Sequence, residues 1–284
     1  MKKVLFFLIL AGVVAFGGWY ILRKPSEGPR GEENSRNTEE LAGLEQKVLA
    51  FSIDGRSSKG ARQWHLEGNS AEILEDEIHL QDLRAEAYGD DNTVNLVSER
   101  GIYRKDKGEV ELIGNVRVTT SDGTLLTTDS AKWSQNTKEI STDDPVRIER
   151  EGLVAEGIGG MANSDKKTAS LVRDVEVIME PHTTVTCRGP LTVNSETNTA
   201  VFLEDVKVED KDGKLFSDKL TVLFDKDEQK LSEVIAEGNV KVKRGNSYTI
   251  SEKAVYSDST KSARLEGKPR IIIDPQELEE LDAL

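Results

Sequence analysis

Residues that commonly carry out catalysis or bind metals are few in this chain and are poorly placed for either task. The three histidines, His65, His79 and His182, lie far apart, and none has the spacing of a metal-ligand pair. The adjacent carboxylates Asp90-Asp91 and Asp143-Asp144 lie in turn-like sequence, where solvation explains them better than acid–base chemistry. A G-x-S-x-G motif, a phosphate-binding P-loop, an EF-hand calcium loop and a nucleophilic Cys-His arrangement are all missing. We therefore expect no enzymatic activity, no cofactor and no metal ion.

The charge of the chain excludes nucleic acids as partners. Four basic residues flank an apolar N-terminus, so residues 25–284 hold 34 basic and 52 acidic side chains, a net charge of −18. Such a body repels phosphates, and no basic stripe interrupts it. The expected partners are therefore apolar molecules or other proteins.

The composition favours a slender sheet over a dense globular core. Only 36% of the residues are hydrophobic and 5% are aromatic, which suits strands that bury one face and expose the other. Cys187 is the single cysteine, so no intramolecular disulfide forms, and a free buried thiol is expected there. The sheet and its core alone must then stabilise the fold.

The N-terminus predicts a membrane anchor. An uncharged run of nineteen residues extends from Val4 to Leu22 and includes Trp19 and Tyr20 near its end. As a helix this run spans about 28 Å, close to the hydrocarbon thickness of a bilayer, and the Trp-Tyr pair suits the membrane interface. A cleavable signal peptide is the alternative, because Ala15-Phe16-Gly17 resembles a cleavage site. Signal peptides have shorter apolar regions, however, of about 7–15 residues, so we favour an uncleaved anchor.

A linker follows this anchor. Residues 25–45 are polar and rich in Pro, Gly, Glu and Asn, which is typical of a flexible tether. The acidic, disulfide-free body beyond it argues for export. We expect residues 1–24 to form a short cytoplasmic tip and the transmembrane span, with the remainder outside the cytoplasm.

A short alternating strand recurs in the exported body. Its clear copies begin at Val116, Val146, Val175, Val206 and Val240. The spacings are 30, 29, 31 and 34 residues, and each copy reads Val-x-Val or Val-x-Ile with a charged residue between. Because strand side chains alternate, each copy has one apolar and one charged face. Similar sequences lead into the copies, as in Ile113-Gly-Asn115 and Glu237-Gly-Asn239.

A second element recurs about fifteen residues after the first, for example at Ala131-Lys-Trp133 and Ala254-Val-Tyr256. Turn sequences such as Asp210-Lys-Asp-Gly213 separate the two elements. Each period is therefore expected to hold two strands of about six to ten residues. The apolar faces require a covering sheet, so the prediction is an all-β elongated jellyroll of about seven two-strand repeats. Either two stacked sheets or one long sheet rolled over itself satisfies the pattern.

The aligned repeats resemble the periplasmic proteins of lipopolysaccharide export. The likeness to LptC rests on the anchor, on Trp64-His-Leu-Glu-Gly-Asn-Ser-Ala71 and on Leu96-Val-Ser-Glu-Arg-Gly-Ile-Tyr103. A likeness to LptA (OstA) is clearest at Ala236-Glu-Gly-Asn-Val-Lys-Val242 and Ile250-Ser-Glu-Lys-Ala-Val-Tyr256. The resemblance covers roughly residues 45–273, and a typical LptC would end near Pro181.

This resemblance implies a twisted, slightly open jellyroll that carries the acyl chains of lipopolysaccharide in a groove. It implies an LptC-like part over residues 46–180, an LptA-like continuation over 181–274 and an acidic tail over 275–284. It also implies a periplasmic body on an inner-membrane anchor, supplied by an inner-membrane ABC transporter and joined to other jellyrolls edge to edge. Such an open sheet edge presents unpaired backbone groups to a partner strand.

The residues expected to line the groove are those on the apolar face. They are Val116, Val118, Trp133, Val146, Ile148, Val175, Val177, Val206, Val208, Val222, Val240, Val242 and Tyr256. The competing interpretation of each is ordinary sheet core. The competing interpretation of the whole chain is a structural or adhesive β-repeat that binds only proteins.

Overall fold

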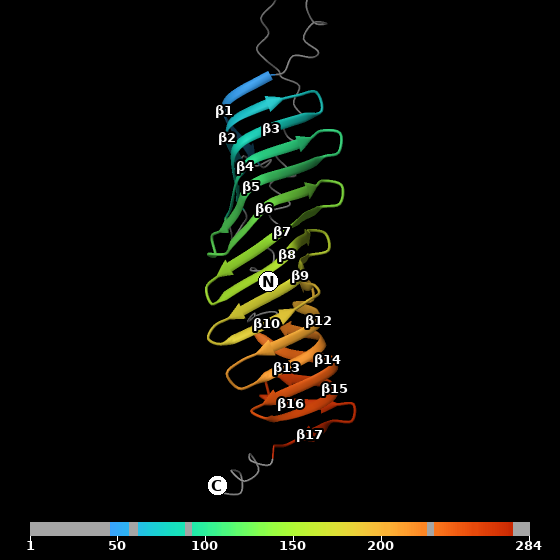
Figure 1. The fold of residues 1–284 in the computed structure, drawn as a ribbon. Coiled ribbons are helices and arrows are strands. Elements are labelled where there is room, and N and C mark those ends of the chain that lie inside the picture. Colours follow the sequence, from blue (N-terminus) through green and yellow to red (C-terminus); the bar gives the residue numbers. More distant parts are fainter. Residues whose placement is uncertain (1–45, 57–61, 89–92, 226–229, 275–284) are drawn as a thin grey trace, which may run out of the picture.

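A computed structural model describes residues 46–56, 62–88, 93–225 and 230–274 as an all-β protein (Figure 1). The predicted anchor, the linker and the acidic tail lie outside these residues. No helix in the described ranges is long and apolar enough to cross a bilayer. Seventeen antiparallel strands belong to one sheet. Of the two predicted architectures, the molecule therefore adopts the single long sheet.

The strands are β1 (Gln46–Arg56), β2 (Arg62–Ile73), β3 (Glu77–Tyr88), β4 (Thr93–Arg104), β5 (Glu109–Thr120), β6 (Leu125–Ser134), β7 (Glu139–Arg150), β8 (Leu153–Asn163), β9 (Thr168–Met179), β10 (Thr183–Cys187), β11 (Leu191–Asn194), β12 (Thr199–Glu209), β13 (Lys214–Phe224), β14 (Leu231–Arg244), β15 (Ser247–Ser257), β16 (Ser262–Glu266) and β17 (Arg270–Ile272).

The sheet is a meander in which strands that follow one another in the chain lie side by side along its length (Figure 1). At two places in the sheet, two short strands together take the position of one long strand. β10 and β11 both pair with β9 on one side and with β12 on the other. β16 and β17 both pair with β15 at the C-terminal end. The sheet thus continues past residues 180 and 181, and the predicted boundary there stays a prediction.

The long strands bend near their middle. In β5 the bend falls at Gly114 and Asn115, and in β14 at Gly238 and Asn239, all four with positive φ. The pairing register of both strands shifts there, and glycine and asparagine tolerate this left-handed conformation best. The Gly-Asn pairs were expected to lead into separate strands of six to ten residues. That expectation was wrong, because β5 has 12 residues and β14 has 14, and each Gly-Asn lies inside its strand.

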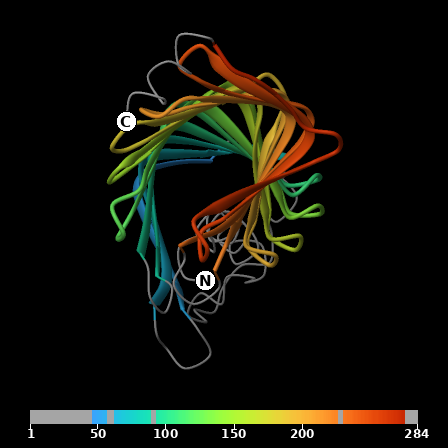
Figure 2. The same ribbon diagram turned by 90° about the horizontal axis from the view of Figure 1, so that it is seen from below.

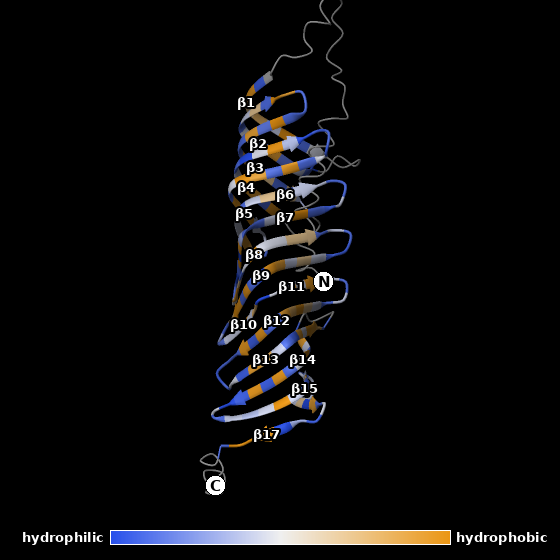
Figure 3. Ribbon diagram, turned by 45° about the vertical axis from the view of Figure 1, so that its right-hand side comes forward, coloured by the Kyte–Doolittle hydropathy of each residue, from blue (hydrophilic) through white to orange (hydrophobic). Residues whose placement is uncertain are grey.

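The bends let the two halves of each strand face one another around a common interior. Leu112 precedes the bend of β5 and Val118 follows it, yet both belong to one buried cluster. Viewed along the long axis, the sheet curves around that interior (Figure 2). Polar and apolar bands alternate along the strands, as the period of two requires (Figure 3).

The core consists of two clusters that meet in β7 and β8. Ile140 and Ala162 belong to the first cluster, whereas Val146 and Ala155, from the other halves of the same two strands, belong to the second. The two halves of β7, and likewise of β8, therefore pack at different levels of the sheet. One half of each of these two strands packs towards the N-terminal end, and the other half packs towards the C-terminal end. No single strand separates the two cores.

Candidate functional site

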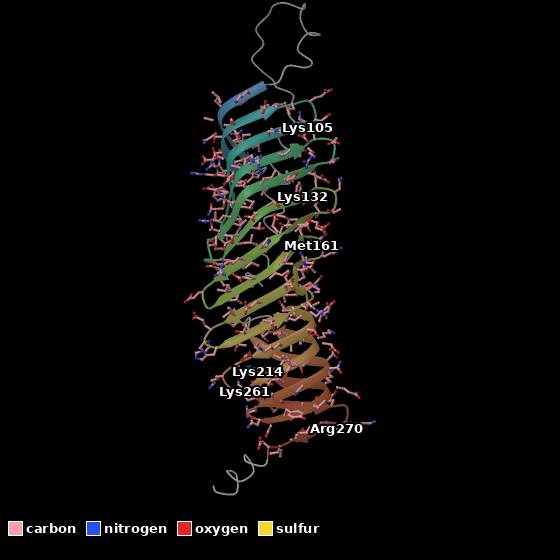
Figure 4. The ribbon with its side chains drawn as sticks, viewed as in Figure 1. Lys105, Lys132, Met161, Lys214, Lys261 and Arg270 are labelled. Carbon is pink, nitrogen blue, oxygen red and sulfur yellow. The ribbon has the colours of Figure 1, made fainter. Side chains whose placement is uncertain are left out.

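The side chains predicted to line a groove all lie on the interior side or at its margin. Eight are buried, namely Val116, Val118, Trp133, Val146, Val175, Val177, Val206 and Val240. Five are half-buried, namely Ile148, Val208, Val222, Val242 and Tyr256. Their neighbours in sequence point outward, as Lys132 does beside Trp133 with 68% of its side chain exposed (Figure 4).

Twelve buried residues form a continuous row along the interior at the bends, and we call this set the inner row. Along it, a branched aliphatic side chain on one strand pairs with a smaller side chain on the next. The pairs are Leu83–Ser98, Val116–Thr128, Val146–Gly157, Val175–Cys187, Val206–Ser217 and Val240–Ser251. Every member is buried. The row runs from β3 to β15 and crosses both core clusters.

The smaller residue of each inner-row pair was not identified from the sequence. Its members are Ser98, Thr128, Gly157, Cys187, Ser217 and Ser251. Their spacings are 30, 29, 30, 30 and 34 residues, which follow the spacings of the valines closely. The signal was therefore present as a period in side-chain size. It was overlooked because four residue types share the position.

An acidic residue follows four of these small residues, and in two of the four cases it bonds to the bend of the next strand. Glu99 accepts a hydrogen bond from the side-chain amide of Asn115. Asp218 accepts one from Asn239 Nδ2 at 2.9 Å. The Ser/Thr-Asp/Glu pairs and the Gly-Asn pairs, distant in sequence, thus form one device that holds the strand bend.

The hydroxyl groups of the inner row have hydrogen-bond partners towards the N-terminal end of the molecule but not towards the C-terminal end. Ser98 Oγ donates to the Arg100 carbonyl oxygen at 3.2 Å. Thr128 Oγ1 lies 3.5 Å from Thr142 Oγ1. Ser217 Oγ and Ser251 Oγ, in contrast, are fully enclosed and have no hydrogen-bond partner among the described residues.

Two indole nitrogens are also enclosed without a partner in the part of the chain that the structure describes. They are Trp64 Nε1 on β2 and Trp133 Nε1 on β6. Buried polar atoms are normally hydrogen-bonded, so each exception requires an explanation. All four exceptions lie on inward-facing positions of the rolled sheet.

A hollow of about 670 Å³ lies at the bends of β5 to β9. The pairing of β6 with β7 is interrupted there between Thr127 and Lys132, a longer interruption than the one between Ile113 and Val116 of β5. Side-chain contacts replace the missing ladder, including Ser130 Oγ to Asp144 Oδ2 at 2.5 Å. The lining residues are Asn115, Val116, Arg117, Thr127, Thr128, Asp129, Pro145, Val146, Arg147, Glu156, Gly157, Ile158 and Asp174.

The residues first considered for chemistry are not brought together where the structure describes them, and Asp90-Asp91 lie outside the described residues. His65 contacts Asp54, with 2.8 Å between Nδ1 and Oδ1, and His79 contacts Glu77, with 2.7 Å between Nε2 and Oε2. No group of three or more potential metal ligands occurs among the described residues. Cys187 is free and buried, as expected, and burial raises the pKa of its thiol to about 11.

Comparisons with known proteins agree with the pattern of the repeats. Residues 7–180 match the sequence model of the family described as lipopolysaccharide-assembly, LptC-related. Residues 190–279 match that of the LptA/(LptD N-terminal domain) LPS transport proteins. One similar solved structure is LptH, the LptA-homologous periplasmic component of the lipopolysaccharide transport device of Pseudomonas aeruginosa. It has 15% identity and a TM-score of 0.36, and the match covers 43% of this chain and 95% of that one. No curated protein matches the chain.

Proposed function

This chain belongs to the LptC-related family of lipopolysaccharide-assembly proteins, and from that premise we propose that its rolled sheet is a conduit for acyl chains. It takes part in lipopolysaccharide transport, as both of its family matches do. The proposal adds the path that lipopolysaccharide follows along the protein. Lipopolysaccharide from an inner-membrane ABC transporter enters the N-terminal part, and its acyl chains then pass through the interior towards the outer membrane.

The observation that carries the proposal is the inner row. It places an apolar or small side chain at each step from β3 to β15, and the charged residues of the same strands lie outside. Burial of an acyl chain releases about 0.8 kcal/mol per methylene group. A row without interruption lets a chain move from one level to the next without exposure to water.

The interior is closed by its own side chains, so acyl chains must displace them. Val240 has 0% exposure and Val116 has 2%. The two halves of each long strand could move apart about the bend, because the backbone connects the halves only there. The net charge of −18 on residues 25–284 disfavours anionic head groups at the outer surface, so recognition falls on the tails.

The end strands are the surfaces that we propose for protein partners. In the described residues, β1 pairs only with β2, and β16 and β17 pair only with β15. Leu49 is 72% exposed on β1 and Ile271 is 67% exposed on β17. Strand addition at these edges, to a transporter subunit or another jellyroll, would cover both side chains. An anchor over residues 4–22 would hold the N-terminal edge at the inner membrane and the body in the periplasm.

Site-specific photo-crosslinking in cells tests the conduit. A photoreactive amino acid at Val116, Val146 or Val240 is expected to capture lipopolysaccharide. The same amino acid at Lys132 or Glu176, outward positions beside Trp133 and Val175 that do not line the hollow, is expected to capture little. Adducts at none of the three inward positions, in variants that accumulate as the parent does, would exclude the conduit. Such a result would favour the repeat that binds only proteins.

A further inference from the structure

We propose that Ser217 and Ser251 are two separate hydrogen-bonding sites, each for a hydroxyl group carried on an acyl chain. This inference rests on the proposed conduit, because a ligand reaches the two serines only through the interior. It adds a chemical preference to that conduit. The C-terminal half would distinguish a hydroxylated acyl chain from a plain one.

The two hydroxyls lie on the same side of the sheet and on either side of one valine. Ser251 pairs with Val240, and Ser217 pairs with Val206 and faces the bend of the same β14 strand that holds Val240. Two strand spacings of about 4.8 Å therefore separate the serines. Each is 5% exposed, and its Oγ has no partner among the described residues.

The surroundings of the serines are apolar on the inside and acidic on the outside. Their core cluster contains Val206, Val240 and Ala254. Asp218 and Glu252, the residues that follow the serines, are exposed. No charged residue is buried in the part of the chain that the structure describes, so an anionic head group would meet no buried cation there. A neutral hydroxyl on a hydrocarbon chain fits both the apolar surroundings and the enclosed oxygens.

The chemistry of the pairing favours a ligand hydroxyl over other groups. A serine hydroxyl left without partners lacks both a donor and an acceptor, and a ligand hydroxyl supplies both. A chain hydroxyl carried into an apolar conduit would itself be unpaired, so the contact satisfies two groups at once. The equivalent serine of the N-terminal half, Ser98, donates to Arg100 and has no such vacancy.

The test is a competition between two acyl chains that differ only in the hydroxyl group. The full chain, held in amphipol, is incubated with equal amounts of β-hydroxymyristate and myristate, and native mass spectrometry measures which one is bound. The parent protein is expected to favour β-hydroxymyristate. In the Ser217→Ala/Ser251→Ala variant this preference should fall by about two- to tenfold, the value of one hydrogen bond. Ser98→Ala, at the matched position of the row, should leave the preference unchanged.

Thermal unfolding without ligand gives an independent readout. Removal of an enclosed, unpaired hydroxyl is expected to raise the melting temperature of the double variant, whereas Ser98→Ala loses a hydrogen bond and should not gain stability. An unchanged preference in the double variant, with both acyl chains still bound, would overturn this inference and leave the conduit standing. A lower melting temperature together with loss of both ligands would show that the serines are structural, which also overturns it. Absence of binding of either acyl chain to the parent protein would overturn the conduit itself.

Discussion

The N-terminal and C-terminal cores of this sheet are built on the same repeat but are filled differently. The first core includes Tyr103 and Trp133 among its buried side chains, and the hydroxyls of its inner row have partners. The second core has Phe202 as its single buried aromatic side chain among the described residues and otherwise small and branched aliphatic ones. Its inner row contains the two unpaired serines, Ser217 and Ser251.

This difference shows which features of the repeat both halves require and which interior side chains can differ between them. Both halves keep the bend, the alternating row and the outward charges, because these close the roll. The interior fill is free to change, since any inward side chain of suitable size completes the core. The N-terminal half uses that freedom for bulk, and the C-terminal half leaves polar groups available to a ligand.

Deletion of one large side chain from each core is expected to have the largest effect. Trp133→Ala and Phe202→Ala should each lower the free energy of unfolding by about 3–5 kcal/mol, through lost burial and the cavity that remains. Because β7 and β8 contribute to both cores, we expect one cooperative transition that either substitution shifts. Urea unfolding of the full chain, followed by circular dichroism, measures the shift.

Fluorescence reveals whether the two cores unfold together. In a Trp19→Phe background both remaining tryptophans, Trp64 and Trp133, lie in the N-terminal half. For Phe202→Ala in this background, fluorescence and circular dichroism should give the same lowered midpoint. If circular dichroism falls first while fluorescence keeps the parent midpoint, the halves are separate units and the shared-strand interpretation fails.

Substitution at the bend should have a smaller effect that is equal in the two halves. Gly238 has a φ of 77° and Gly114 has a φ of 83°, and a Cβ at either position would meet the carboxylate of Asp218 or Glu99. We expect Gly→Ala there to lower the free energy of unfolding by about 1–2 kcal/mol for the left-handed conformation alone. Displacement of the carboxylate should add to that loss.

Gly123 provides the control for the bend. It has a φ of 84° in a turn, with open space around the position of a Cβ, so Gly123→Ala measures the conformational effect without the clash. Gly238→Ala and Gly114→Ala should both exceed it in chemical denaturation. A Gly238→Ala effect no larger than that of Gly123→Ala would show that the carboxylate does not support the bend.

The interior face was predictable from the sequence because a strand places alternate residues on opposite sides. Val116 and Val240 were identified as inward residues by that rule alone, and both are buried. The bends could not be recognised in the same way. Gly114-Asn115 reads as a turn locally, whereas its contact with Glu99 on the neighbouring strand is out of reach of a local pattern.

Whether each buried hydroxyl group has a hydrogen-bond partner could not be predicted from the sequence either. Ser98-Glu99 and Ser217-Asp218 occupy the same place in the repeat and read alike. They differ because the bend of β4 brings the Arg100 carbonyl oxygen to Ser98, whereas no acceptor among the described residues reaches Ser217. That difference depends on the local course of the backbone, which the two residue types do not reveal.

Cys187 offers a test of the inner row inside the second core, without a change to either half. It lies in the inner row, and burial raises the pKa of its thiol to about 11, whereas an exposed cysteine has a pKa of about 8.5. A raised pKa leaves less reactive thiolate, so alkylation at pH 8 should be at least about 100-fold slower than for an exposed thiol. The rate should still climb about tenfold between pH 8 and pH 9, because the titration midpoint lies higher. Glu196→Cys in a Cys187→Ala background supplies the exposed control, whose rate should rise only about threefold over the same range. A rise of only about threefold for Cys187, like that of the exposed control, would mean that water reaches the inner row inside the second core.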